Sequence, residues 1–147
     1  MKQTRPRSLA ICVFKNKDRI LVAEGYDSVK EQLFYRPLGG SIEFGEHSRS
    51  TIARELQEEI GAEVTELRYL GTIENIFTYN GEMGHEIVIV YAGRFTDSSF
   101  YERERIDAIE DDTIPFTVVW KPLTYFQQGY APLYPDGLLE LLANEGL

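Results

Sequence analysis

Apolar residues occur along this chain in short runs separated by turn-forming and charged residues. Runs rich in β-branched and aromatic residues predict strands at 8–14, 19–23, 33–36, 67–78, 86–95 and 116–120. Asn16-Lys17-Asp18 predicts a turn between the first two strands, and Asn80-Gly81 is a strong turn signal between the fourth and the fifth. Residues 87–91 are apolar at every position, which is typical of a central strand covered on both faces.

One stretch has the period of a helix. Residues 48–60 contain no Gly or Pro and are followed by Gly61, a frequent residue just past a helix C-terminus, so they predict a helix. At about 100° per residue, its apolar side chains share one face and three glutamates share an adjoining arc. The apolar face consists of Ile52, Ala53, Leu56 and Ile60, and the acidic arc consists of Glu55, Glu58 and Glu59.

The last third of the chain predicts less regular structure. Residues 97–113 are polar and acidic and predict a long loop with room for a short helix. Pro122 is expected to open a short helix that ends near Gly129. Residues 135–144 predict a terminal helix with four leucines inward, namely Leu138, Leu139, Leu141 and Leu142. Strands on either side of a central helix, with another helix at the end, indicate an α/β sandwich with a mixed sheet.

Length and composition narrow the class of protein. The 147 residues fit a single domain, 1–147, that buries roughly two thirds of the surface of its unfolded chain. No apolar run approaches the roughly 20 residues needed to cross a bilayer, so we expect a cytoplasmic protein without membrane association. The single cysteine, Cys12, lies in an apolar run, so we expect it in the core and not as a nucleophile.

The charge is unevenly distributed. A net charge of −9 argues against general binding to nucleic-acid backbones, which requires basic patches. Residues 1–40 carry eight basic and four acidic side chains, whereas the rest of the chain carries 7 basic and 20 acidic ones. Arg36 immediately precedes a glycine-rich segment and is therefore the side chain we expect to contact an anion, although a solvated surface charge is the alternative.

The acidic arc suggests a metal site. Like charges three and four residues apart destabilise a helix by a few tenths of a kcal/mol per pair, and no lysine within this helix offsets them. A divalent cation would offset them, because hard cations such as Mg²⁺ prefer oxygen ligands. The segment before the helix, residues 38–46, contains three glycines, which allow a ligand to approach the backbone closely.

Residues 40–62 read G-S-I-E-F-G-E-H-S-R-S-T-I-A-R-E-L-Q-E-E-I-G-A, and this pattern resembles a Nudix box. The pattern positions fall on Gly40, Glu46, Arg54, Glu55, Leu56, Glu58, Glu59, Gly61 and Ala62, of which only the small Ala62 fits weakly. Many relatives have Pro-Gly-Gly where this chain has Pro37-Leu38-Gly39-Gly40. The resemblance implies a Nudix-type α/β/α sandwich with a mixed β-sheet.

The resemblance also implies a function. The family cleaves nucleoside diphosphates linked to another moiety, so it implies a Mg²⁺-dependent pyrophosphohydrolase, a hydrolase of acid anhydrides, with Mn²⁺ as an alternative ion. The implied metal ligands are Glu55, Glu58, Glu59 and the carbonyl of Gly40, with Glu46 close to the same site. The family's arginine, here Arg54, ties the loop to the helix by pairing with box carboxylates, although its angle on the helix points it away from the acidic arc.

The general base and the substrate are less well defined. Glu58 is the first candidate for the base, and the later carboxylates Glu102, Glu104, Glu110 and Asp111 are alternatives. Relatives that act on dinucleoside polyphosphates often have a tyrosine about seventeen residues beyond the box, where Tyr79 lies, so we weakly favour that class over nucleotide sugars and nucleoside triphosphates. Phe77, Tyr79 and Trp120 would stack on a base if they line the pocket, although side-chain packing is the alternative for Tyr79. His85 and Glu86 open the central strand and are expected to face the site, where His85 would contact phosphate, although a surface histidine at a strand end is the alternative.

Two other functions remain open on the same fold. A catalytically silent nucleotide-binding sensor would usually have lost box glutamates, which are intact here. An isomerase of isoprenoid diphosphates would need a cysteine near the pocket, and Cys12 is a poor candidate. The sequence leaves open whether the protein forms a homodimer and how many metal ions it binds.

Overall fold

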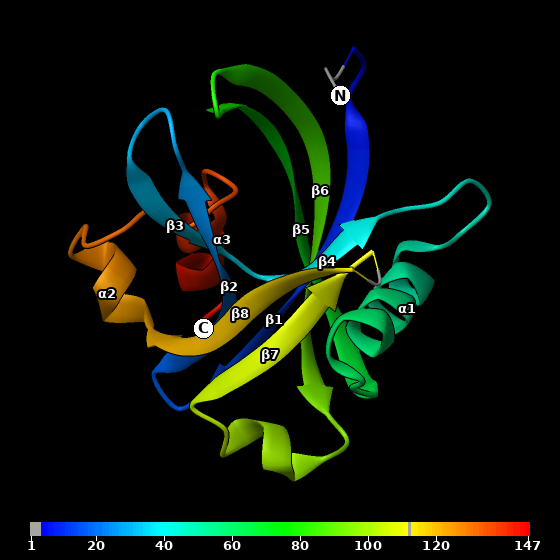
Figure 1. The fold of residues 1–147 in the computed structure, drawn as a ribbon. Coiled ribbons are helices and arrows are strands. Elements are labelled where there is room, and N and C mark those ends of the chain that lie inside the picture. Colours follow the sequence, from blue (N-terminus) through cyan, green and yellow to red (C-terminus); the bar gives the residue numbers. More distant parts are fainter. Residues whose placement is uncertain (1–3, 112) are drawn as a thin grey trace.

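A computed structural model describes residues 4–111 and 113–147 and shows three α-helices and a large sheet among them (Figure 1). The strands are β1 (Arg7–Asn16), β2 (Arg19–Asp27), β3 (Gln32–Arg36), β4 (Leu38–Ser41), β5 (Val64–Tyr79), β6 (Glu82–Phe95), β7 (Arg105–Glu110) and β8 (Ile114–Pro122). The helices are α1 (Ser48–Ile60), α2 (Leu123–Gln127) and α3 (Leu138–Asn144), with a 3₁₀ turn at Ser98–Tyr101. None of the helices in this described part of the chain is long and apolar enough to cross a membrane.

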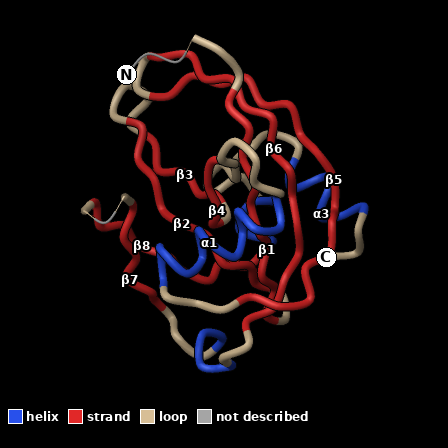
Figure 2. The backbone as a smooth tube through the Cα atoms, turned by 90° about the vertical axis from the view of Figure 1, so that its right-hand side faces the viewer, coloured by secondary structure: helices blue, strands red, loops and turns tan. Residues whose placement is uncertain are grey.

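The sheet is mixed, as predicted. Its strand order is β5-β6-β1-β2-β8-β7, with β3 paired to β2 and β4 paired to β1. β1 runs parallel to β6 and antiparallel to both β2 and β4. The β5 and β6 strands form a long hairpin that extends along most of the molecule (Figure 2). The predicted central strand 87–91 is part of β6, which lies between β5 and β1.

Helices cover both faces of the sheet, because β1 is apolar on both sides. Alternate β1 residues pack into a core with α1: Ala10, Cys12 and Phe14 meet Ile52 and Leu56. The intervening β1 residues pack on the other face with α3: Leu9, Ile11 and Val13 meet Leu138 and Leu142. Cys12 is therefore a core residue, as predicted, and burial raises the pKa of its thiol.

Two strands replace predicted loops. The start of the glycine-rich segment forms β4, because Gly39 and Gly40 let its backbone pair closely with β1; a Cβ on Gly39 would collide with the carbonyl oxygen of Ala10. The predicted loop 97–113 contains β7, an edge strand that buries only Ile106 and Ala108 and otherwise carries charged side chains and the exposed Ile109. Residue 112 of that predicted loop lies outside the described residues.

Two helix predictions were also inexact. α3 begins at Leu138 and not at residue 135, and Leu139 and Leu141 are only partly buried, because a seven-residue helix presents a narrow buried stripe. On α1, Ile52 and Leu56 are buried, whereas Ala53 is exposed at the edge of the apolar face.

Candidate active site

Helix α1 carries the acidic arc and is held in place by its buried face and its C-terminal cap. Ile52 and Leu56 are fully buried against the sheet, which fixes the rotation of the helix about its axis. The C-terminus closes at Gly61, which has a left-handed φ of 66° and donates its N–H to the carbonyl of Gln57 at 3.0 Å. This bond and the left-handed φ form a C-cap of the αL type, and the N–H of Ala62 donates to the carbonyl of Leu56 at 3.2 Å. The direction of the glutamates is therefore set by packing and capping.

Arg54 lies at the centre of the box carboxylates. Its Nε and Nη2 donate to the two oxygens of Glu46 at 2.9 and 3.0 Å, and its Nη1 donates to Glu55 at 2.8 Å. Nη1 also makes a longer hydrogen bond to Glu58 at 3.4 Å, and Nη2 donates to the carbonyl of Ser41 at 3.1 Å. The expectation that Arg54 points away from the acidic arc was wrong, because the guanidinium at the end of its long side chain reaches Glu55 and Glu58 as well as Glu46.

These bonds shift the ionisation of both partners. The hydrogen bonds from Arg54 and then from Thr51 lower the pKa of Glu46 to about 2, and the pKa of Arg54 is raised in return. Arg54 therefore connects the loop before the helix, through Glu46 and the carbonyl of Ser41, to Glu55 on the helix.

Glu59 has a different environment. One of its carboxylate oxygens, Oε1, is buried and has no hydrogen-bond partner among the described residues. Burial, followed by the charges of Glu55 and Glu110, raises the pKa of Glu59 to about 8, while a backbone hydrogen bond from Gly39 and the charge of Arg36 oppose the shift. Burial also raises the pKa of Glu55, which Arg54 opposes.

Gly40 leaves space for the Glu55 carboxylate. A Cβ built on Gly40 would lie 2.6 and 2.7 Å from the two carboxylate oxygens of Glu55, closer than real contacts allow. The φ of Gly40 lies outside the left-handed region, so the position requires glycine for its small volume and not for its backbone angle. Backbone and carboxylate oxygen therefore meet at the point where the resemblance places metal ligands.

The donor set fits a hard divalent cation, although it is not gathered as a finished site. Within residues 4–111 and 113–147, no three His, Cys, Asp or Glu side chains stand close enough to hold an ion as they are. Arg54 donates hydrogen bonds to Glu55 and Glu58, so both carboxylates point toward its guanidinium. Two carboxylates nevertheless offer the oxygen ligands that Mg²⁺ prefers. Glu59 has a buried oxygen without a hydrogen-bond partner, and the Glu55 carboxylate lies against the backbone of Gly40.

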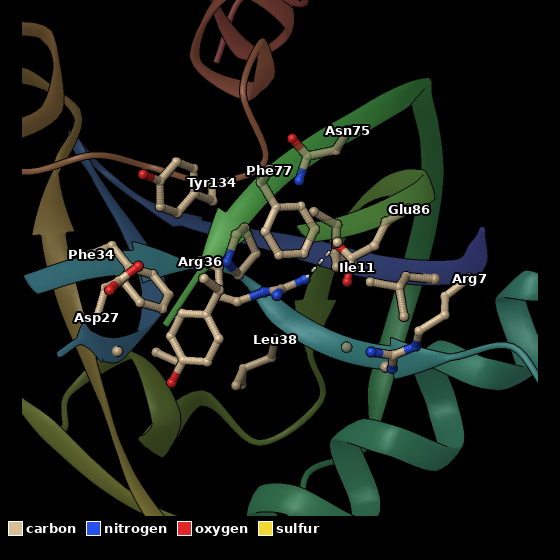
Figure 3. Close-up of a pocket in the computed structure, with 18 of the residues that line it drawn as sticks. Arg7, Ile11, Asp27, Phe34, Arg36, Leu38, Asn75, Phe77, Glu86 and Tyr134 are labelled. Carbon is tan, nitrogen blue, oxygen red and sulfur yellow. Dashed lines mark ion pairs between the residues drawn. The ribbon is translucent and has the colours of Figure 1, made fainter. Parts of the chain in front are cut away.

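A cavity of about 680 Å³ adjoins the acidic helix (Figure 3). One side is formed by the β2–β3 hairpin and the other by the β5–β6 hairpin, while β4 and Glu59 border it at the box. Arg36, Phe77 and Tyr79, which the sequence analysis selected, all line this cavity. Its volume is in the range of small-molecule sites.

Arg36 stands between two acidic groups in this cavity. Its Nη2 lies 3.7 Å from Oε1 of Glu86, as the dashed line in Figure 3 shows, and its charge lowers the pKa of Glu59. The Arg36 side chain is 35% exposed and lines the cavity, so it is accessible to a ligand that enters there.

Two predicted contacts lie elsewhere. His85 is paired with Ile76 in the β5–β6 ladder and lies 4.0 Å from Glu74, on the opposite face of the hairpin from its cavity-lining neighbour Glu86. Trp120 is buried in the α1 side of the core, where its Nε1 donates to the carbonyl of Phe100 at 3.2 Å.

The structure separates the four later carboxylates. Glu110 lines the cavity and raises the pKa of Glu59, and Asp111 next to it raises the pKa of Glu55. Glu102 and Glu104 precede β7, whose six residues span roughly 17 Å, so they lie at the far end of that strand. Only the first pair is close to the acidic helix.

Phe34 and Asn75, on β3 and β5, also line the cavity, and sequence reasoning did not select them. Glu86 on β6 lines the cavity, as expected of it, whereas its neighbour His85 does not. Which of two adjacent strand residues points inward depends on strand register, which the sequence pattern did not fix.

A sequence profile of the NUDIX domain matches residues 4–136. The chain belongs to the NUDIX family. A Mycobacterium tuberculosis (strain CDC 1551 / Oshkosh) protein named as mutator protein MutT4 is 29% identical to this Nudix chain over 107 residues. The matched region is 73% of this chain but 43% of the relative, so the chain spans less than half the length of that curated relative.

Solved structures share the fold of this Nudix chain. A NUDIX hydrolase from Nitrosomonas europaea has a TM-score of 0.67 at 15% identity, over 97% of this chain and 89% of the other. The MutT NUDIX hydrolase from Burkholderia pseudomallei has a TM-score of 0.61 at 21% identity, over 82% and 86% of the two chains. A NUDIX-family hydrolase from Clostridium perfringens has a TM-score of 0.62 at 17% identity, over 97% and 99%. These likenesses confirm the predicted α/β sandwich fold.

Proposed function

We propose that this chain is a metal-dependent pyrophosphohydrolase that cleaves the phosphoanhydride linkage of a nucleoside diphosphate derivative. The observation that carries the proposal is the position of the complete Nudix box: its acidic helix borders a cavity large enough for a nucleotide. The family membership and the MutT-named relative support the same class of reaction.

Mg²⁺, or Mn²⁺ in its place, is the cation we propose. The groups that would hold it are the side chains of Glu55, Glu58 and Glu59 and the carbonyl of Gly40. Two observations support this set: Glu59 has a buried oxygen without a partner, and Gly40 lies very close to the Glu55 carboxylate. When bound, such a cation neutralises charge on a diphosphate and lowers the pKa of a coordinated water.

The remaining box residues position this set. Arg54 fixes the loop through Glu46 and limits the movement of Glu55, so its task is structural. Gly61 ends the helix and thereby fixes its last turn, which carries Glu58 and Glu59. Arg36 faces the cavity beside the box and would bind the diphosphate as a charged donor.

Glu58 is the general base we propose, and Glu110 is the alternative. Glu58 is about half exposed and held only weakly by Arg54, which leaves it able to accept a proton from water. Glu110 qualifies because it lines the cavity from a separate strand. Glu110→Gln distinguishes them, since Glu58→Gln also removes a proposed metal ligand. Loss of kcat with unchanged affinity for substrate in Glu110→Gln would assign the base to Glu110, whereas retained kcat would leave Glu58 as the base.

The substrate class rests on fewer contacts. Tyr79 lines the cavity and meets the ring of Phe34 edge-on, with centroids 5.7 Å apart, so a base could extend this aromatic cluster. This placement is compatible with the weakly favoured dinucleoside polyphosphates, and with nucleotide sugars and nucleoside triphosphates. A single domain over residues 1–147, a cytoplasmic location, a homodimer and the lack of general nucleic-acid binding also remain proposals.

The test is a panel of these three substrate classes and ADP-ribose, incubated with protein and Mg²⁺, with products identified by mass. Glu58→Gln should reduce turnover by orders of magnitude, whereas the matched control Glu140→Gln, at an exposed site on α3 across the sheet, should not. Binding without cleavage by the wild-type protein would instead support the nucleotide-binding sensor.

A further inference from the structure

Two buried polar side chains face each other inside the cavity. Asn75 on β5 and Glu86 on β6 are directly paired in the antiparallel ladder, and only 5% and 3% of their surfaces are exposed. Both line the cavity, and Figure 3 shows Asn75 and Glu86 on neighbouring strands there. Directly opposed residues have Cβ atoms about 5 Å apart, so the two side chains can contact one small group together.

Glu86 has an unused hydrogen-bonding oxygen. Its Oε1 is buried without a hydrogen-bond partner among the described residues, and the nearest cation, Nη2 of Arg36, is 3.7 Å away. A buried carboxylate without hydrogen bonds is costly, so this oxygen is suited to accept from a ligand that enters the cavity.

Two phenylalanine rings lie beyond this polar pair, away from the box. Phe77 follows Asn75 by two residues on the same face of β5, which corresponds to about 7 Å. Its ring covers Gly84 on the paired strand, where an added Cβ would collide with the ring. Phe34 covers Gly25 in the same way across the β2–β3 hairpin. Both rings line the cavity and offer flat surfaces to a base.

The strand register orders the groups that line the cavity. Gly40 pairs with Ala10 of β1, Glu86 pairs with Arg7 three residues earlier on β1, and the Phe77–Gly84 pair lies two residues further along the β5–β6 hairpin than the Asn75–Glu86 pair. The box therefore comes first, the polar pair comes next, and Phe77 lies beyond it. A nucleotide has the matching order of phosphate, sugar and base. The polar pair consequently lies where the sugar of a nucleotide would be placed.

We propose that Glu86 and Asn75 bind the vicinal hydroxyls of a ribose, so that the protein prefers ribonucleotide derivatives over 2′-deoxyribonucleotide derivatives. This inference rests on the proposed function. An ionised carboxylate only accepts hydrogen bonds, and a vicinal diol offers two O–H donors to it, while the amide of Asn75 can donate to a hydroxyl oxygen. Loss of one hydroxyl would again leave a buried carboxylate oxygen unpaired, which corresponds to roughly 10- to 100-fold in kcat/KM.

The experiment compares ribonucleoside and 2′-deoxyribonucleoside triphosphates of all four bases, with Mg²⁺, by kcat/KM. The wild-type ratio should be about 10 or more for every base, and Glu86→Gln and Asn75→Leu should bring it near 1 mainly by losing ribonucleotide activity. Arg36→Gln is the matched control, because it removes the ion pair to Glu86 without changing the hydroxyl contacts; both sugars should lose activity together. Thermal unfolding of each variant checks that it folds.

A separate binding arm keeps the two proposals distinguishable. Affinities of AMP and 2′-deoxy-AMP are measured by calorimetry with wild-type protein and Glu86→Gln. Absence of hydrolysis with a ribose preference in binding would refute the proposed function and support the sugar site. Equal kcat/KM and equal affinity for the two sugars would overturn the sugar site, as would a wild-type ratio that Glu86→Gln leaves unchanged. A preference that follows the base and not the sugar would also overturn it and would assign Glu86 to the edge of the base.

Discussion

Gly40→Ala should separate the activity of this protein from its stability. The added methyl group would lie 2.6 and 2.7 Å from the carboxylate oxygens of Glu55, whereas ordinary contacts begin at 3.4 Å. The carboxylate is the movable partner, because Gly40 is part of β4 and is hydrogen-bonded to β1. The carboxylate carbon of Glu55 is closer still, so Glu55 must retreat by about 1 Å, away from the backbone with which it is proposed to share a metal ion.

A displacement of about 1 Å in a reacting constellation costs on the order of 100-fold, so we expect kcat to fall by roughly 30- to 100-fold. The backbone of Gly40 needs no left-handed angle, so the free energy of unfolding should change by less than about 1 kcal/mol. Steady-state hydrolysis with saturating Mg²⁺ and chemical denaturation measure the two quantities on the same preparation.

Two other glycine-to-alanine substitutions serve as controls. Gly71→Ala also adds a methyl group to a strand, but it meets only the flexible end of Leu141, 3.0 Å away on the α3 side, and should leave kcat within about twofold. Gly39→Ala would collide with the backbone of Ala10 and should prevent folding. The reasoning is refuted if Gly40→Ala retains wild-type kcat, or if it unfolds the protein as Gly39→Ala does.

Three further predictions concern the same helix. The pKa of Glu59 is about 8 in the folded chain, above its ordinary value of 4.5, so folding takes up a proton between these pH values. The metal-free protein should therefore lose up to about 1.4 kcal/mol of stability for each unit that the pH rises in this range. Urea titrations in chelator should show that Glu59→Gln removes this dependence on pH. Arg54→Lys cannot bridge Glu46 and Glu55 with one planar group, so it should lower stability by about 2 kcal/mol and kcat by at least about tenfold; unchanged values would exclude the bridging role. Gly61→Ala should cost about 1 kcal/mol at its left-handed φ without affecting KM, as thermal unfolding and kinetics can establish.

The sequence predicted the elements whose patterns are periodic. The helix 48–60 was correct at both ends, because its apolar face is regular and Gly61 marks the C-terminus. β7 was missed, because an edge strand with two buried residues, Ile106 and Ala108, has almost no periodic signal. β4 was missed because its pairing depends on a close approach to β1, a contact made far along the chain.

The same distinction applies to the candidate site. The box carboxylates could be found from spacing along one helix, since a helix fixes their relative directions. Glu86 and His85 show where spacing fails: both were expected to face the site, but adjacent strand residues point to opposite faces of β6, so only Glu86 lines the cavity. Residues that contact a ligand from several strands require the register of the whole sheet.

The charges around α1 lead to a last prediction, about metal binding. Arg54 balances the negative charges of Glu46 and Glu55. The charge of Glu59 is balanced only partly by Arg36, and Glu110 on β7 adds further negative charge beside it. This excess is unfavourable in the metal-free chain, so a cation that binds the folded state should stabilise it by about 2.7 kcal/mol at a concentration of 100 Kd. For a chain of this size that corresponds to a rise in Tm of roughly 5 to 10 °C with Mg²⁺. Glu59→Gln should have a higher Tm than wild type in chelator and a smaller rise with Mg²⁺, because it removes both the repulsion and a ligand. A Tm that Mg²⁺ leaves unchanged in wild-type protein would show that the acidic arc does not bind the ion.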